Sequence, residues 1–239
     1  MFITMKDIIV FIVLFGANLI QAITGFAGTL IAMPPTIKLI GVVEAKALLN
    51  VIAQISCLLI VITGWKHINW KEFAKMFSLM IVGMLVGIKI FEIAPINQLL
   101  VAYGIMIIVI ALWKLFIKKE LKLPQIWILF IIFMAGIIHG MFVSGGALLV
   151  IYASSVLKDK EEFRATVALI WVTIGCYITG QQVIAGNFNS HVGLLLVIGL
   201  IPVFVGTWFG TKLVKRIDQQ MFLKITYVLL LLSEVMAIV

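Results

Sequence analysis

The sequence has few charged residues and no long polar stretch. Only 12% of its 239 residues are charged, whereas 64% are hydrophobic, and the mean hydropathy is +1.24. A soluble domain is about half apolar and about a quarter charged, so the composition excludes an ordinary soluble fold. It predicts an all-α integral membrane protein whose surroundings are the lipid bilayer. The net charge of +8 therefore does not indicate nucleic-acid binding, which would place the charge on a solvated face.

Cysteines and recognisable cofactor motifs are also scarce. The two cysteines, Cys57 and Cys176, both lie in apolar segments, where packing is a better interpretation than a disulfide or a metal site. No nucleotide-binding motif is present, so no cofactor and no metal are expected.

The apolar segments fall into two series of five. Each series starts with a segment that is interrupted by glycines and continues as a short piece, followed by three ordinary spans of crossing length. The first series covers residues 8–24, a break at 25–28, then 29–37, 45–63, 73–90 and 96–113; the second covers 125–139, a break at 140–146, then 147–157, 165–184, 192–210 and 221–239.

The two series match in detail, which predicts an internal duplication. The string Gly28-Thr29-Leu30 corresponds to Gly146-Ala147-Leu148 at an offset of 118, and Glu44 corresponds to Glu162 at the same offset. Gly83 and Gly87 correspond to Gly206 and Gly210 at an offset of 123. We therefore expect two homologous membrane repeats, residues 1–122 and 123–239, each with a broken hairpin and three transmembrane helices.

The distribution of lysine and arginine favours hairpins over full crossings at the two breaks. If each broken unit crosses once, the basic residues divide 8 against 10, but if each is a hairpin they divide 14 against 4. The second split is the bias that the positive-inside rule predicts. Three crossings per half invert the halves relative to each other, as in many secondary transporters. Both termini are then outside the cell inner membrane.

The breaks are where an anion is expected to bind. A helix that begins after glycines at mid-membrane has N–H groups without intrahelical partners and a partial positive charge. Two such ends that face each other could hold a small anion, with help from the hydroxyls of Thr24, Thr29 and Ser144. The alternative is that the glycines, including Gly25, only allow close helix packing.

Polar residues at helical spacing extend this hypothesis along the spans. Gln21 and Gly25 share one helix face, and Asn50 and Gln54 share another. Such faces should point inward, either to line a pathway or to hold helices together. The predicted substrate-binding set is Gln21, Thr24, Gly25, Gly28, Thr29, Asn50, Gln54, His139, Ser144, Gly145, Gly146 and Thr166.

Three further features carry two interpretations each. His139, the counterpart of Gln21, could carry a coupling proton or could be a neutral structural residue. Lys46 and Arg164 occupy matched positions and could attract anions or extend to the headgroups. The glycine pairs at 83/87 and 206/210 could be packing contacts or ligand contacts, and packing is the prediction.

The motifs resemble those of the TauE/SafE family of sulfite-exporter-type permeases. The strings that carry the likeness are Thr24-Gly25-Phe26-Ala27-Gly28-Thr29-Leu30-Ile31-Ala32-Met33-Pro34, Ser144-Gly145-Gly146-Ala147-Leu148-Leu149-Val150 and Arg164-Ala165-Thr166. The resemblance implies an eight-span transporter of sulfite, thiosulfate, sulfonates or related organic anions in the bacterial inner membrane, often coupled to protons. Ala27 and Thr29 stand where the family has glycines, and Tyr152 stands where the second half would repeat Pro34.

Two other function classes remain beside the secondary transporter. A passive anion channel would conduct without proton counter-transport. An intramembrane enzyme would use Ser144 with His139, but the surroundings are not Gly-x-Ser-x-Gly and no paired acid lies near in the sequence. The expectation is therefore a non-enzyme that binds a small anion, with a homodimer left open.

Overall fold

The described part of the protein is entirely helical. The computed structural model describes residues 4–99, 101–102, 105, 124–218, 221–222 and 228, so the predicted spans 96–113 and 221–239 lie mostly outside it. The elements are α1 Met5–Thr24, α2 Ala27–Ile40, α3 Val42–Gly64, the 3-10 turn η1 Trp65–His67, α4 Trp70–Ile93, α6 Gln125–Phe142, α7 Gly146–Val156, α8 Lys160–Ile184 and α9 Ser190–Val214.

Six of these helices are long and apolar enough to cross a membrane: α1, α3 with η1, α4, α6, α8 and α9. Several of them begin a few residues earlier than the hydropathy pattern predicts, because polar capping residues start them. Asn69, Asp159 and Asn189 each accept hydrogen bonds from N–H groups of the first turn, at the starts of α4, α8 and α9. Hydropathy excludes these residues from the spans, although they belong to the helix starts.

The structure confirms both breaks. After α1, Gly25 adopts a left-handed conformation with φ 84°, and after α6, Val143 does so with φ 55°. The second break, residues 143–145, lies within the predicted 140–146 but starts later, because Gly140 is still helical. A β-branched residue such as Val143 is strained in this region, and such strain gathers at functional sites.

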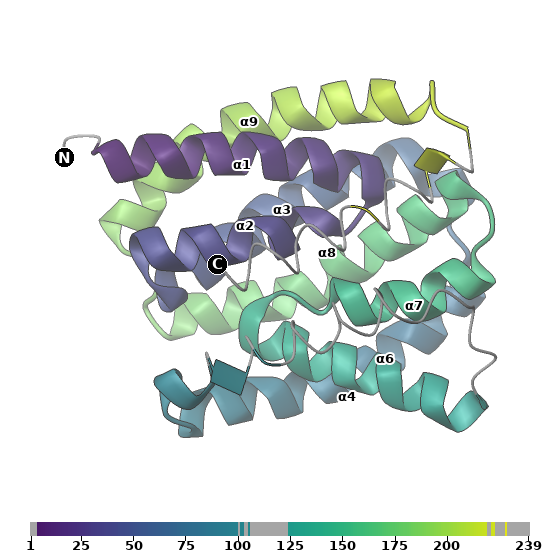
Figure 1. The fold of residues 1–239 in the computed structure, drawn as a ribbon, viewed down its shortest axis with the longest axis horizontal. Coiled ribbons are helices and arrows are strands. Elements are labelled where there is room, and N and C mark those ends of the chain that lie inside the picture. The colour runs from purple at the N-terminus through teal and green to yellow at the C-terminus, as the bar shows by residue number, and fades with distance from the viewer. Residues whose placement is uncertain are drawn as a thin grey trace.

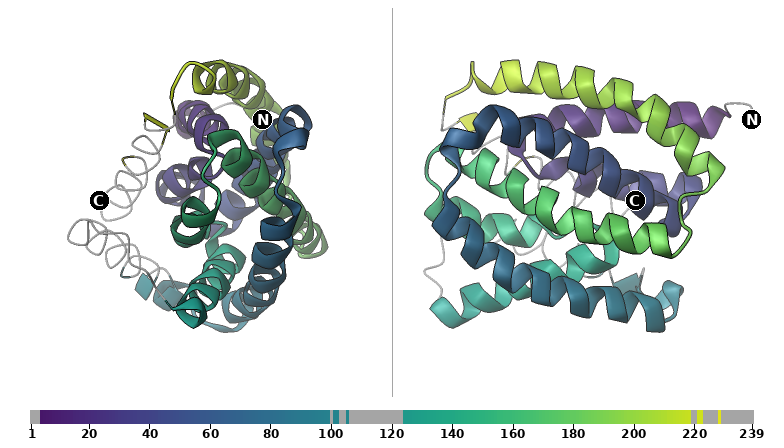
Figure 2. Two further views of the ribbon diagram at one scale, coloured as in Figure 1. Left: turned by 90° about the vertical axis from the view of Figure 1, so that its right-hand side faces the viewer. Right: turned by 180° about the vertical axis from the view of Figure 1, so that it is seen from behind.

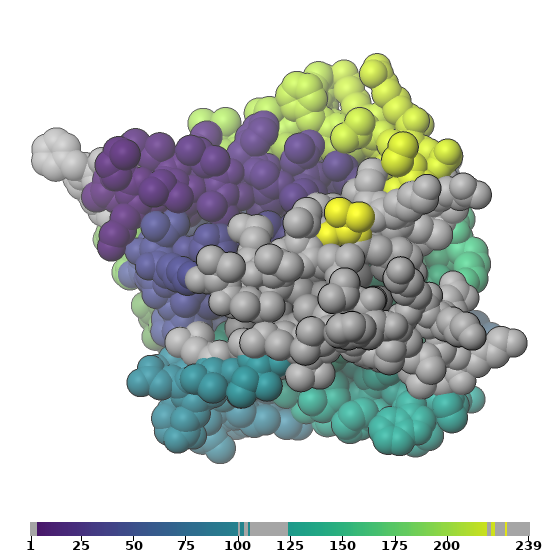
Figure 3. Space-filling model, viewed as in Figure 1, coloured from purple at the N-terminus to yellow at the C-terminus, as the bar shows by residue number. Residues whose placement is uncertain are grey.

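The helices pack in pairs that correspond when the two halves are exchanged. In one pair, α1 of the first half packs on α9 of the second half; in the corresponding pair, α6 of the second half packs on α4 of the first half. The pair formed by α3 and α8 lies between these two pairs. α2 runs back along α1 and α7 runs back along α6 (Figure 1), and the views in Figure 2 show α3 between α9 and α8. In the space-filling view, α1 and α9 form one margin of the molecule, and α4 and α6 form the opposite margin (Figure 3).

The four paired glycines allow two of these close helix contacts. A Cβ on Gly83 or Gly87 would lie 2.1 Å from a backbone oxygen of α6. A Cβ on Gly210 would lie 2.6 Å from the Cβ of Ala22 on α1, and Gly206 is also in contact with α1. The prediction that these residues serve packing is confirmed, and the same device is used once in each half.

Candidate functional site

Residues from both breaks meet around a small cavity of about 10 Å³. Cavities of this size hold about one water molecule. Half of the predicted site residues line it, together with Phe26, Ala53, Val143 and Trp171; the predicted ones are Gln21, Thr29, Asn50, Gln54, His139 and Gly146. The structure therefore brings together residues that are up to 150 positions apart in the sequence.

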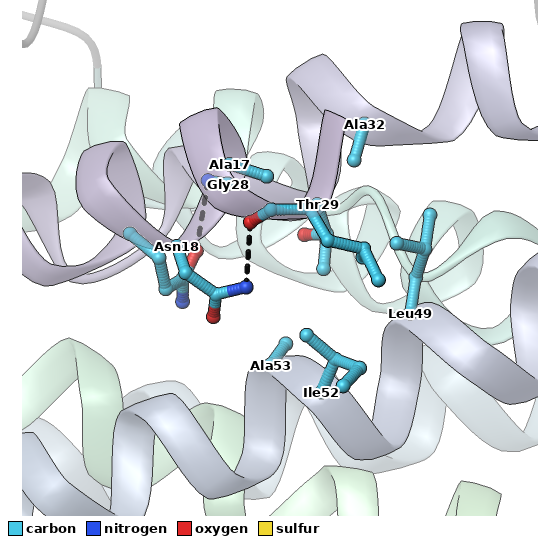
Figure 4. Close-up of a pocket in the computed structure, with 10 residues that line it drawn as sticks. Ala17, Asn18, Gly28, Thr29, Ala32, Leu49, Ile52 and Ala53 are labelled. Atoms are coloured by element: carbon cyan, nitrogen blue, oxygen red, sulfur yellow. Dashed lines mark hydrogen bonds between the residues drawn. The ribbon is translucent and has the colours of Figure 1, made fainter. Parts of the chain in front are cut away.

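A second cavity of the same size adjoins the first on the side of α1, α2 and α3. It shares Gln21, Thr29 and Ala53 with the first cavity and adds Asn18 and Gly28. Figure 4 shows Ala53 and Leu49 of α3 facing Thr29 and Gly28 of α2 across it. The polar lining thus continues from the breaks along the first helix.

Side chains of the first break form hydrogen bonds with the break's own backbone N–H groups. Gln21 Oε1 accepts a hydrogen bond from the Gly28 N–H at 2.8 Å. Thr24 Oγ1 accepts from the N–H groups of Phe26 at 3.3 Å and Ala27 at 3.1 Å. This differs from the expectation of two bare helix ends, because side chains of the α1 end cap the start of α2.

The second break leaves polar groups without partners. His139 Nδ1 and Nε2 and the Trp171 Nε1 are buried and have no hydrogen-bond partner among the described residues. The two rings stack, with centroids 4.8 Å apart and an interplanar angle of 29°. Buried polar groups are nearly always satisfied, so unpaired atoms that line a cavity indicate a place for a ligand.

Sequence reasoning missed Trp171, although a signal was present. Trp171 stands 118 positions after Ala53, which lies between the predicted Asn50 and Gln54 in the first half. Tryptophan counts as apolar in a hydropathy scan, but its indole N–H needs an acceptor when it is buried. The duplication and the side-chain chemistry together would have identified it.

The amides of Asn50 and Gln54 both line the cavity and join the halves. Asn50 Nδ2 donates to the Gly175 carbonyl at 3.1 Å and to Thr179 Oγ1 at 2.8 Å. Gln54 Nε2 donates to the Val172 carbonyl at 3.4 Å. The two interpretations of this stripe, pathway lining and helix association, therefore apply to the same side chains.

Lys46 and Arg164 bind backbone carbonyls at corresponding places in opposite halves. Lys46 Nζ donates to the Gly140 carbonyl of α6 at 2.6 Å, and Arg164 Nε donates to the Ala22 carbonyl of α1 at 2.5 Å. Both acceptors lie in the last turn of a helix, where carbonyls lack intrahelical partners and the dipole favours a cation. The two side chains are 2% and 3% exposed, so neither lies at the molecular surface as the sequence interpretations supposed.

The other predicted residues do not line this cavity. Ser144 Oγ donates to the Phe142 carbonyl at 2.9 Å, and Thr166 Oγ1 accepts from the Asn69 N–H at 2.9 Å. Gly25 lies against the Arg164 backbone. Thr24 caps α2, as described above.

Gly28 and Gly145 allow close packing inside the two hairpins. A Cβ on Gly28 would lie 2.5 Å from the Ala17 oxygen, and one on Gly145 would lie 2.1 Å from the Ala135 oxygen. Ala17 and Ala135 are 118 positions apart, so the structure pairs Gly28 with Gly145 and not with Gly146. Gly146 instead faces Phe26 of the first break, where a Cβ would lie 2.9 Å from the ring.

Two other chemistries have little support in this arrangement. Within residues 4–99 and 124–218 and the few others described, no group of three His, Cys, Asp or Glu side chains could hold a metal ion. Ser144 is bonded to a carbonyl and not to His139, so the pair does not form a nucleophile and its base. Both cysteines are free thiols.

Comparison with known proteins gives one match. The family model described as sulfite exporter TauE/SafE matches residues 10–236, which is nearly the whole chain. No curated protein and no solved structure matches it.

Proposed function

The chain belongs to the sulfite exporter TauE/SafE family, and from this premise we propose that it is a secondary transporter of a small, sulfur-containing oxyanion. The family consists of membrane transporters and not of enzymes, and six described helices of spanning length agree with a multi-pass membrane protein. The substrate in question is sulfite, thiosulfate, a sulfonate or a related organic acid.

The observation that carries this proposal is a pair of stacked side chains, His139 of α6 beside the second break and Trp171 of α8, whose buried nitrogens have no partner among the described residues. A neutral imidazole offers one N–H donor and one nitrogen acceptor, and indole offers one N–H donor. An oxyanion with one protonated oxygen accepts from both donors and donates to the remaining nitrogen. If the proton resides on His139 instead, a fully ionised anion accepts from all three N–H groups. In both cases one proton accompanies the anion, which is the basis for proton coupling.

The electrostatic surroundings favour a negative guest. The N-terminus of α7 has no side-chain cap, and Gly146 at its start lines the cavity. The positive charge of Lys46 lies nearby on the Gly140 carbonyl, one residue from His139. Neutral donors at the cavity wall with cations behind them can hold an anion without a direct ion pair in the membrane.

We further propose that the transporter works by alternating access between two inverted repeats, residues 1–122 and 123–239. The exchanged packing pairs support the repeat, since α1 packs on α9 as α6 packs on α4. The cavity is smaller than a four-atom oxyanion, so admission of the anion requires the hairpins to separate. The positive-inside bias supports an inner-membrane location with both termini outside.

The proposal can be tested with Trp171→Phe in proteoliposomes. Phenylalanine retains the stacked ring but lacks the N–H donor, so we expect sulfite flux to fall about 10- to 100-fold, the loss of one hydrogen bond to a charged group. Trp65→Phe is the matched control because Trp65 is 55% exposed and lines neither of the two small cavities. Undiminished flux in the Trp171 variant would reject the site.

The same vesicles separate the transporter from a passive channel. With a pH indicator inside, a coupled transporter moves protons in a fixed ratio to sulfite, whereas a channel conducts the anion without them. Thiosulfate, sulfonates and carboxylates, tested as competitors of sulfite, rank the substrates.

A further inference from the structure

A large groove lies between α3 and α9, away from the proposed anion site. Its volume is about 730 Å³. Much of its wall is apolar and exposed; Ile62 is 65% exposed and Phe204 is 53% exposed. An apolar groove on the outside of a transmembrane bundle is in contact with lipid chains.

One end of the groove is polar and positively charged. Lys212 and Lys215 line this end, and the Lys212 ammonium lies 3.5 Å from the centre of the Trp208 ring. Thr211, also in the lining, accepts a hydrogen bond from Arg164 Nη2 at 2.7 Å, so a third cation lies behind this end. Because α9 ends at Val214, these charges lie at the depth where lipid headgroups begin.

The corresponding place in the first half is neutral. The offset of 123 aligns Lys89 with Lys212 and Glu92 with Lys215. Lys89 and Glu92 form an ion pair at 2.8 Å. Among the described side chains, no acidic group lies within ion-pairing distance of Lys212 or Lys215. The second half thus has two uncompensated cations where the first half has a closed pair.

We propose that the α3–α9 groove binds one anionic phospholipid, with an acyl chain on its apolar wall and the phosphate between Lys212 and Lys215. Basic pockets between transmembrane helices select anionic headgroups, and the topology predicted from the sequence places most of the basic residues on this side of the membrane. The phosphate also accepts a hydrogen bond from the Thr211 hydroxyl, whose oxygen is bonded to Arg164.

Charge argues for a lipid over a second copy of the chain. Two copies that met through this groove about an axis along the membrane normal would bring the same residues together at the same depth. The lysine pairs at 212 and 215 of both copies would then face each other, and like charges repel. A bound phosphate neutralises the lysine charges, whereas the groove of a second copy adds two more positive charges.

The test compares phosphatidylglycerol with phosphatidylcholine on the purified full-length protein in an uncharged detergent. Native mass spectrometry should show phosphatidylglycerol binding at least about tenfold more tightly. Replacement of both lysines, Lys212→Gln with Lys215→Gln, should weaken phosphatidylglycerol about 20- to 30-fold, since each basic residue contributes to headgroup attraction, and should leave phosphatidylcholine unchanged. Lys215→Glu, which recreates the Lys89–Glu92 pair, should abolish the preference.

The control variant removes the same charge from the same side of the membrane. Lys66→Gln with Lys71→Gln changes two exposed residues that do not line the groove, so it should retain the preference. Equal binding of both lipids by the natural protein, or an equal loss in the control variant, would overturn the proposal. A lipid-free dimer that the groove-filling Val205→Trp dissociates would assign the groove to a second copy and overturn it as well.

Discussion

The two breaks share a backbone plan but differ in how their side chains use it. In the first, Gln21 and Thr24 occupy the N–H groups at the start of α2. In the second, His139 stands at the position of Gln21, and no group in the described part of the chain forms a hydrogen bond with its ring nitrogens. The amide of Gln21 thus caps a helix start, whereas under the proposed function the imidazole of His139 at the corresponding position contacts the anion.

The difference extends to the turns themselves. Gly25 takes the left-handed conformation without steric cost, whereas Val143, 118 positions later, takes it with strain. The first turn is relaxed and internally hydrogen-bonded, and the second is strained, while both line the cavity, through Phe26 and Val143. We interpret the first break as a rigid structural wall of the proposed site, and the second as the wall whose side chains bind the anion.

The largest expected effect is a difference between substitution of a glycine that packs against backbone, Gly28, and of a glycine that lines the cavity, Gly146. A side chain at Gly28 would meet the Ala17 oxygen, which belongs to the backbone, so Gly28→Val should prevent accumulation of folded protein. Gly146→Val meets the side chains of Phe26 and Leu30, which can shift, so it should fold and lose sulfite flux. Gly193→Val is the control because no atom lies within 4 Å of its added Cβ. Gel-filtration profiles and flux measure both effects, and normal folding of Gly28→Val would contradict this division.

Exchange of the residues at the two breaks tests their separate roles directly. His139→Gln should retain folding but lower flux about 10- to 100-fold, because the guest loses a hydrogen bond. Gln21→Ala should lower the free energy of unfolding by about 1–3 kcal/mol, because the Gly28 N–H loses its acceptor. Its flux per folded molecule should fall less than that of His139→Gln. Denaturant titration with proteoliposome flux measures both, and Gln98→Ala, at an exposed position, is the control. If Gln21→Ala lowered flux more and His139→Gln lowered stability more, Gln21 would be the binding residue and His139 the structural one.

The two buried cations, Lys46 and Arg164, should both stabilise the folded protein, Arg164 more than Lys46. Lys46→Met removes the donor to Gly140 and should destabilise the protein by about 1–3 kcal/mol. Arg164→Met should destabilise it more, because Thr211 and Glu161 also lose a partner. Unfolding in denaturant measures the difference, with the exposed Lys66→Met as the control. If neither substitution lowered stability, the carbonyl contacts would be incidental.

The smallest expected effect is the loss of a helix cap, and it tests whether two similar capping asparagines, one in each half, contribute equally to stability. Asn69 caps α4 and donates to Glu162 at 2.7 Å, and Asn189 caps α9 and donates to Glu44 at 2.7 Å. Replacement of either by alanine should lower stability by about 0.5–2 kcal/mol. The two losses should be alike, and serine should restore part of each. A large difference in unfolding midpoint between the two variants would limit the equivalence to the backbone.

Much of this organisation could be predicted from the sequence, because glycine, charge and periodicity act locally. The two breaks, the packing glycines and the convergence of Gln21, His139 and Asn50 all follow from spacing and from the 118-residue offset. The hydrogen bonds could not be predicted, since periodicity identifies a helix face but not the atom that each side chain reaches. Gln21 was therefore expected to face a ligand, although its oxygen is occupied by Gly28.

The exchanged contacts of Lys46 and Arg164 have a consequence for biosynthesis. Arg164 emerges from the ribosome 142 residues after its acceptor Ala22, so its partner is already in the bilayer. Lys46 emerges 94 residues before Gly140, and at about 5–20 residues per second its acceptor follows roughly 5–20 s later. Until then the Lys46 ammonium lacks this carbonyl, and its partner within the first half is the ring of Phe91, whose centroid lies 4.0 Å away. We therefore expect the packing around Lys46 to become complete only after residue 140 has been synthesised.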